Sequence, residues 1–225
     1  MSVNDLKFKH PFTSIVSGMS GSGKTTFVER LLKNWESVIL SDIKHLRILW
    51  CYSLDESLKN LFKDPFKNVT IVYHKGIPTM NEIGKYKPNL IVFDDLMDEV
   101  DDNVRLLFTR GARHLNFSVL LLVQNLFNQN KHMRTVNLNA QYIILTDDLS
   151  NLQHLKHICA QYFPGKLNQL YDIFNHAISN FGYLVIQKGP RAPFEYRFRT
   201  RIFREELIED LSRRHSFCPI FYKLK

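Results

Sequence analysis

The stretch SGMSGSGKTTFVERLL, residues 17–32, constrains the fold of this chain more than any other segment. Gly18, four intervening residues and then GKT at residues 23–25 fit the phosphate-loop pattern G-x-x-x-x-G-K-[ST]. Such a loop brings successive backbone N–H groups close to phosphate oxygens, and side chains in place of its glycines would obstruct that approach. The chain is therefore expected to contain a strand, a glycine loop and a helix that together bind a phosphorylated ligand.

The start of that helix supplies the rest of the predicted site. Its unpaired N–H groups and the positive end of its dipole favour an anion. In this pattern Lys24 reaches the β- and γ-phosphates, and the Thr25 hydroxyl ligates magnesium. The residues expected to bind the nucleotide are Gly18, Ser20, Gly21, Ser22, Gly23, Lys24, Thr25 and Thr26.

Short apolar runs along the chain predict an α/β fold with a mainly parallel sheet. Phe12–Ser17 is the expected strand before the phosphate loop, and an apolar stripe from Phe27 to Trp35 marks the helix after it. Further runs are typical of strands buried on both faces. They are Leu46–Tyr52, Val69–Tyr73, Leu90–Phe93, Ser118–Val123 and Gln141–Leu145. Helices are expected over residues 100–111, 150–162 and 166–179, and closing strands over Tyr183–Gln187 and Phe194–Phe203.

Composition sets limits on the class of protein. With 225 residues, 44% of them hydrophobic, we expect a single domain over residues 1–225, with its core in residues 12–203 and a short tail at 204–225. Three scattered cysteines predict neither a disulfide framework nor a zinc site. No apolar signal core or membrane span is apparent, so an intracellular, non-secreted protein is expected. The net charge of +8 makes binding to a polyanion worth considering.

Two carboxylates follow a buried strand at the point where a metal is expected. Leu90–Phe93 is followed directly by Asp94 and Asp95. Asp94 is suited to hold magnesium beside Thr25, and Asp95 to orient or deprotonate the water that attacks the γ-phosphate. The alternative is an ordinary strand end that meets a solvated acidic loop.

An amide follows the next strand. Ser118–Val123 ends in Gln124, and open α/β sheets place ligands at the carboxyl tips of their strands. Gln124 is therefore a candidate sensor of the γ-phosphate, if its strand lies beside the strand of Asp94. The alternative is a polar strand terminus without a role.

Arginines are the third candidate group, because phosphoryl transfer develops negative charge that an arginine of a neighbouring subunit can neutralise. Arg134 is the first choice and Arg110 the second, with Arg113 also close in sequence. For each of them, a solvated surface arginine is the alternative.

The segments GMSGSGKTT, LIVFDDL, FTRGARHLNFSVLLLVQNLF and MRTVNLNAQYIILTDD occur in this order. Together they resemble the poxvirus-type genome-packaging ATPases of large DNA viruses, which belong to the FtsK/HerA-like DNA-pumping ATPases. The versions in Polinton/Maverick elements and adintovirus-like viruses are the most similar. The resemblance extends from about Phe12 to Phe203, and TRGARHLN followed by a strand and VQNLF is more specific than the phosphate loop.

This resemblance implies a P-loop NTPase three-layer sandwich of the RecA/FtsK-HerA type. Its cofactors would be ATP and Mg²⁺, with Lys24 and Thr25 at the nucleotide, Asp94 as the magnesium carboxylate, Asp95 as the catalytic acid and Gln124 as the sensor. The wider group often has glutamate where this chain has Asp95. The implied partners are double-stranded DNA, a homo-oligomeric ring and capsid proteins, with no membrane, in the nucleus or cytoplasm of a host cell at the assembling virion.

The closing segment RAPFEYRFRTRIFREE places Arg197, Arg199 and Arg201 at period two. Such a row could contact DNA phosphates, or it could protect an edge strand from aggregation or form a subunit interface. His154 and His157 are expected on the polar side of a helix, and no metal is assigned to them.

Two other functions remain open from the sequence. A small P-loop kinase would phosphorylate a nucleotide or metabolite, but the arginine-rich lid and acceptor site of such enzymes are not evident. A nucleotide-binding capsid assembly factor would turn over ATP rarely, and the Asp94-Asp95 pair argues against it.

Overall fold

A computed structural model describes residues 7–53, 62, 66–127, 130–148, 151–179, 182–188, 196–207 and 220–224. Within these residues the chain forms a nine-stranded sheet in the order β11-β10-β9-β8-β2-β7-β6-β4-β5. Its strands are β2 (Thr13–Ser17), β4 (Leu46–Tyr52), β5 (Val69–Lys75), β6 (Leu90–Asp94), β7 (Ser118–Val123), β8 (Tyr142–Thr146), β9 (Tyr183–Gln187), β10 (Phe198–Thr200) and β11 (Ile220–Tyr222). A small parallel pair joins β1 (Phe8–Lys9) to β3 (Ile39–Leu40).

The strand order decides which loops meet. The six strands from β8 to β5 are parallel to their neighbours, and β7 lies between β2 and β6. The phosphate loop after β2 and the acidic pair at the end of β6 therefore lie on either side of the end of β7. All three are at the carboxyl ends of the parallel strands. β9, β10 and β11 extend the sheet antiparallel to β8.

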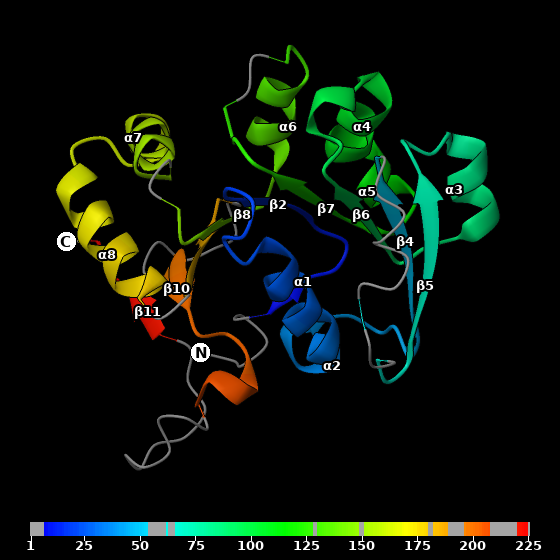
Figure 1. Cartoon of the computed structure of the whole chain (residues 1–225), viewed down its shortest axis with the longest axis horizontal. Helices are drawn as coiled ribbons and strands as arrows, with labels where there is room; N and C mark the ends of the chain where they lie inside the picture. Colours follow the sequence, from blue (N-terminus) through cyan, green and yellow to red (C-terminus); the bar gives the residue numbers. More distant parts are fainter. Residues whose placement is uncertain are drawn as a thin grey trace.

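Helices cover both faces of the sheet (Figure 1). One face packs against α1 (Lys24–Lys33) and α2 (Trp35–Val38). The other packs against α3 (Met80–Tyr86), α4 (Asp102–Leu106), α5 (Ala112–His114), α6 (Met133–Asn139), α7 (Asn151–Tyr162) and α8 (Leu167–Ile178). Short 3₁₀ turns occur at Met97–Glu99 and Arg204–Leu207, and a π-helical turn at Leu107–Gly111. This arrangement confirms the predicted three-layer α/β sandwich.

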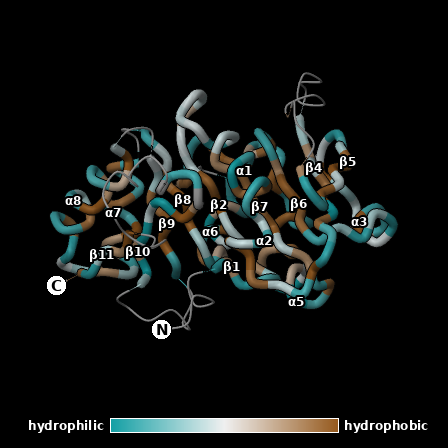
Figure 2. The backbone as a smooth tube through the Cα atoms, turned by 90° about the horizontal axis from the view of Figure 1, so that it is seen from below, coloured by the Kyte–Doolittle hydropathy of each residue, from teal (hydrophilic) through white to brown (hydrophobic). Residues whose placement is uncertain are grey.

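Alternate strand residues build two separate cores. On β2, Ile15 packs toward α3–α8 and Val16 toward α1 and α2, and both are fully buried. Figure 2 shows hydrophobic segments gathered along the central strands and hydrophilic turns on the outside. Burial of both faces explains why the parallel strands appear in the sequence as continuous apolar runs.

Most predicted elements occur within one or two residues of their expected bounds. The helix expected over residues 100–111 occurs without a break over residues 102–114, as α4, a π turn and α5 in succession. β5 is the edge strand and is only partly buried, contrary to the expectation of burial on both faces. Phe194–Phe203 gives a strand only over Phe198–Thr200, with residues 194 and 195 outside the described ranges. α3 and α6 were not predicted.

None of the helices in the described ranges combines the length and hydropathy of a membrane span.

Candidate active site

The phosphate loop turns sharply between β2 and α1. Gly21 and Gly23 have φ values of +80° and +91°, in the left-handed region that favours glycine. Gly18 is required for a different reason, because a Cβ there would lie 2.0 Å from Thr146 Oγ1 and 2.3 Å from Ser22 Oγ. The loop therefore packs tightly against Thr146 at the end of β8. This packing requires glycine at position 18 independently of the close approach of a phosphate.

Lys24 is the first residue of α1, and its ammonium group lies over the loop. Its Nζ donates to the Gly18 carbonyl at 2.6 Å and to the Met19 carbonyl at 2.9 Å. Burial lowers the pKa of Lys24, while the negative charges of Asp94, Asp95 and then Asp148 act in the opposite direction. The charges of three carboxylates thus favour the protonated form of this ammonium group.

Asp94 and Asp95 differ in environment although they are adjacent. Asp94 is 7% exposed at the end of β6, and burial, followed by the charge of Asp95, raises its pKa to about 6. Asp95 is exposed, with a left-handed φ of +54°. The Gln124 Nε2 at the end of β7 donates to Asp95 Oδ1 at 3.3 Å. The strand of Gln124 lies beside the strand of Asp94, as predicted, and Lys24, Asp94, Asp95 and Gln124 lie together.

The residues present fit a magnesium nucleotide. Mg²⁺ prefers hard oxygen ligands, keeps several waters and takes few groups from the protein. Thr25, in the first turn of α1, and Asp94 offer a hydroxyl and a carboxylate. Across the described residues no group of three or more His, Cys, Asp or Glu side chains gathers as a metal site of the all-protein kind. The Thr25 hydroxyl and the Asp94 carboxylate are therefore suitable protein ligands for a Mg²⁺ ion that also binds a triphosphate.

A set of side chains behind the loop was not predicted. Thr146 Oγ1 donates to the Ser17 carbonyl at 3.1 Å and contacts Ser22 Oγ at 2.7 Å. Asp148 Oδ2 accepts the Met19 N–H at 2.9 Å. The signal in the sequence was TDD at residues 146–148, which begins at the last residue of β8. It gives this strand a polar end like those of β6 and β7. The position of these side chains follows from β8 lying next to β2.

A cavity of about 230 Å³ continues from the phosphate loop toward β9. Its lining includes residues 21–23 of the loop, Thr26, Phe27, Arg30 and Tyr183. Arg30 is held by Glu206, with Nη1 to Oε1 at 2.8 Å, and the Tyr183 hydroxyl donates to Glu206 Oε2 at 2.8 Å. The cavity is therefore bounded by side chains that the fold already fixes.

The model of the poxvirus A32 protein family matches residues 2–188. The chain belongs to this family. That membership confirms the predicted resemblance to poxvirus-type packaging ATPases. A comparison with curated protein sequences gives no match.

Solved structures similar to this A32-family chain are distant in sequence. One is the genome packaging NTPase B204 from Sulfolobus turreted icosahedral virus 2 in complex with ATP-gammaS, with 14% identity, coverage of 79% of this chain and 92% of that chain, and a TM-score of 0.46. Another is the ATPase DotB of Legionella pneumophila, with 11% identity, coverage of 77% and 54% respectively, and a TM-score of 0.38.

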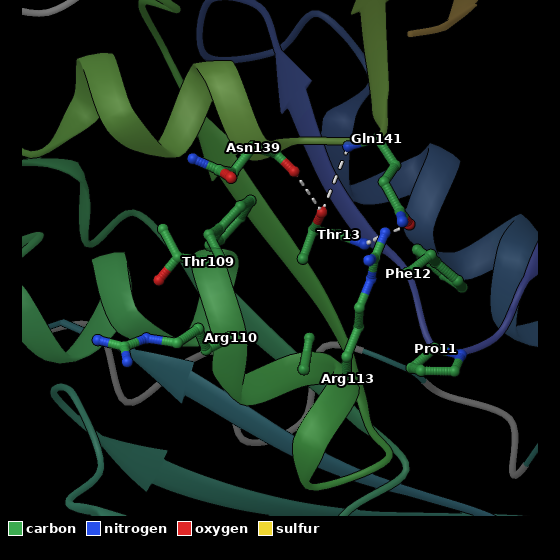
Figure 3. Close-up of a pocket in the computed structure, with 10 residues that line it drawn as sticks. Pro11, Phe12, Thr13, Thr109, Arg110, Arg113, Asn139 and Gln141 are labelled. Atoms are coloured by element: carbon green, nitrogen blue, oxygen red, sulfur yellow. Dashed lines mark hydrogen bonds between the residues drawn. The ribbon is translucent and has the colours of Figure 1, made fainter. Parts of the chain in front are cut away.

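The candidate arginines of the A32-family chain lie at different edges of the sheet. Arg134 is exposed at the start of α6. His132, two residues before it, lies 3.3 Å from Oδ1 of Asp102, the first residue of α4, which follows β6 in the chain. Arg134 is therefore on the side of the phosphate loop. Arg110 and Arg113 are exposed and line a polar cavity of about 130 Å³ that includes Thr13, the first residue of β2 (Figure 3). That cavity lies at the opposite end of the strand from the phosphate loop.

Arg199 departs from the predicted row of exposed arginines. It is fully buried in β10, where Nη1 donates to Gln187 Oε1 at 2.7 Å and the guanidinium lies over the rings of Phe8 and Tyr142. β10 is also not an edge strand, since β11 pairs with it. Arg199 cannot contact DNA phosphates from this position.

His154 was expected on the polar side of its helix, and that expectation is wrong. The side chain is 5% exposed and both ring nitrogens have partners. His157, three residues along the helix, packs against the ring of Phe127 at a tilt of 50°, with centroids 4.8 Å apart.

Proposed function

We propose that this chain is the ATP-hydrolysing motor subunit that packages double-stranded DNA into a capsid, of the kind found in Polinton/Maverick elements and adintovirus-like viruses. One observation carries the hydrolytic part: Gln124 donates to Asp95 next to the Lys24 ammonium and the buried Asp94. A protein that only binds nucleotide has no need for a carboxylate and an amide held in contact at this edge. A single P-loop domain spanning the chain would hold this site.

The residues divide the chemistry of hydrolysis between them. Lys24 binds the β- and γ-phosphates, and Thr25 and Asp94 hold magnesium, which offsets phosphate charge when bound. Asp95 accepts the proton of the attacking water, and its exposure leaves it accessible to that water. Gln124 orients Asp95 and the water through its amide.

The nucleoside occupies the cavity beside the loop. It adjoins Gly21, Ser22 and Gly23, so a triphosphate held by the loop would point its sugar and base toward Phe27 and Tyr183. Phe27 and Tyr183 are both buried, so the Arg30 guanidinium is the group there that can donate to a polar sugar or base.

The subunits assemble head to tail into a ring in which one subunit supplies an arginine to the next. A head-to-tail interface joins two different faces of the same chain, and closes into a ring when the rotation allows. Arg110 lines the cavity at Thr13, the first residue of β2, whereas the phosphate loop follows the last residue of that strand, and five strand residues span about 17 Å. That separation supports Arg110 as a residue acting on a neighbour, whereas Arg134 lies on the same side of the sheet as its own phosphate loop. Capsid proteins at the assembling virion, in the host nucleus or cytoplasm, are the further partners.

Duplex-DNA stimulation of ATP hydrolysis tests the proposal. Wild-type protein should hydrolyse ATP faster with duplex DNA, and Asp95→Asn should lower kcat by about 100-fold or more. Glu99→Gln, an exposed acid four residues on, is the matched control and should hydrolyse ATP normally. Transfer of phosphate to a small acceptor would favour a kinase instead. Intact DNA encapsidation by Asp95→Asn would favour an assembly factor.

A further inference from the structure

His154 of α7 connects two parts of the molecule that are far apart in sequence. Its Nδ1 lies 2.7 Å from Asn151 Oδ1, and its Nε2 lies 3.0 Å from Asn125 Oδ1. Asn125 follows Gln124 at the end of β7. Since both ring nitrogens are engaged, the ring has no free atom for a nucleotide or a metal, and any effect it has on hydrolysis must pass through its partners.

Asn151 anchors the histidine to the base of the phosphate loop. It is fully buried, and its Nδ2 donates to the Thr146 carbonyl at 2.8 Å and to the Ser17 carbonyl at 3.4 Å. These two bonds turn Oδ1 toward His154, so Nδ1 of the ring donates to it. Asn125 Oδ1 is an acceptor as well, so the ring bonds both amide oxygens only when both of its nitrogens carry a proton. Ser17 is the residue before Gly18, and Thr146 contacts the loop through Ser22.

Asn125 forms the other end of the connection. Its Oδ1 also accepts the Phe127 N–H at 2.9 Å, which closes a tight turn after β7. The ring of Phe127 packs on His154, with centroids 5.6 Å apart. The histidine ring thus contacts the turn that follows Gln124 through both Asn125 and Phe127.

We propose that His154 is a positioning residue for ATP hydrolysis. By tying the Gln124-Asn125 turn to the end of β2 through Asn151, it holds the Gln124 amide toward Asp95 and the terminal phosphate. The inference rests on the proposed role of Gln124 and extends it, because the contact between Gln124 and Asp95 involves two exposed side chains and needs a rigid support.

A double-mutant cycle on kcat tests the connection. His154→Ala and Asn125→Ala should each lower kcat by about tenfold with the KM for ATP changed less than twofold, since the phosphate loop and Lys24 are untouched. The double variant should be no slower than either single variant, because both changes break the same chain of contacts. Lys156→Ala, at an exposed position on α7, is the control and should leave kcat unchanged.

Several outcomes would overturn the proposal. They are unchanged kcat in His154→Ala, additive losses in the double variant, or a rise in KM that accounts for the whole defect. If His154→Ala fails to fold, Asn125→Ala, at an exposed position, and His154→Gln carry the same comparison. Gln124→Ala in the same assay separates the two ideas: normal activity there refutes the sensor role, whereas a loss there with normal His154→Ala refutes only the support by histidine.

Discussion

Asp94 combines a catalytic position with an electrostatic cost. Its carboxyl is 7% exposed, and burial together with the charge of Asp95 raises its pKa to about 6. The folded protein therefore binds a proton at Asp94 more tightly than the unfolded chain does. Stability is lost as the pH rises from about 4 to about 6, and the loss persists above that range.

Replacing Asp94 by Asn should remove this cost. Without Mg²⁺ and ATP at pH 8, we expect Asp94→Asn to unfold at a higher temperature, with a gain of about 3 kcal/mol, while ATP hydrolysis is abolished. Denaturation of both proteins from pH 4 to pH 8 measures the difference, which should be absent at the acid end. Equal pH dependence in the two proteins would contradict the assignment.

Gly18 is the second residue whose identity the tertiary structure dictates. Gly18→Ala should lower stability by about 2 kcal/mol and weaken ATP binding, because its methyl group would overlap Thr146 Oγ1. Adding Thr146→Ala should restore part of both losses. Gly84→Ala is the control: a Cβ there meets no atom within 4 Å in α3, so stability should be unchanged or slightly higher. Normal ATP affinity in Gly18→Ala would count against a loop pressed onto β8.

At the scale of elements, the environment of β10 differs most from expectation. Alternation placed three arginines on one face, but the pattern could not tell that β11 covers the edge and that Phe8 and Tyr142 cover Arg199. The side chain is accommodated by one hydrogen bond to Gln187 and by two aromatic faces. It acts in packing, and its charge is not available at the surface.

Arg199→Ala should therefore affect folding and leave the electrostatics of DNA binding unchanged. We expect a loss of about 3 kcal/mol in the free energy of unfolding, from the cavity between two aromatic rings. The slope of log affinity for duplex DNA against log salt concentration should match the wild type. A shallower slope in folded Arg199→Ala would mean that the guanidinium reaches phosphates.

At the scale of the whole molecule, the phosphate loop and the cavity that includes Arg110 lie at opposite ends of β2. Mixing two inactive proteins tests whether these two ends meet in a ring. Lys24→Ala lacks the phosphate-binding ammonium and Arg110→Ala lacks the arginine, so a mixed ring contains some interfaces with both groups intact. We expect the mixture to recover ATP hydrolysis to about a quarter of the wild-type rate per subunit.

The matched mixture uses Arg134→Ala with Lys24→Ala. Recovery only in that mixture would transfer the trans role to Arg134. Absence of recovery in both, with rings confirmed by mass measurement, would show that neither arginine acts across an interface.

The predicted helices and strands that the structure confirms are those with a strong local sequence pattern. The glycine loop, its helix and the buried parallel strands appear where expected, because backbone geometry and continuous apolar runs are local properties. α3 and α6 were missed because each is seven residues long with few buried side chains, too short for a clear helical period. His154 was misplaced because a polar residue on a helix is usually solvated, and only its contacts with Asn125 and Asn151 reveal that it is buried.

The sequence by itself determined the phosphate loop, the α/β class and the resemblance to the packaging-ATPase family. It also identified Lys24, Asp94 and Gln124 as candidate site residues. Each of these inferences depends on neighbours along the chain. Only the tertiary structure decided that β7 lies between β2 and β6, that Thr146 presses on Gly18, and that Arg199 is buried. These facts depend on which segments become neighbours in space. The hydrophobic burial that chooses those neighbours acts on the whole chain at once.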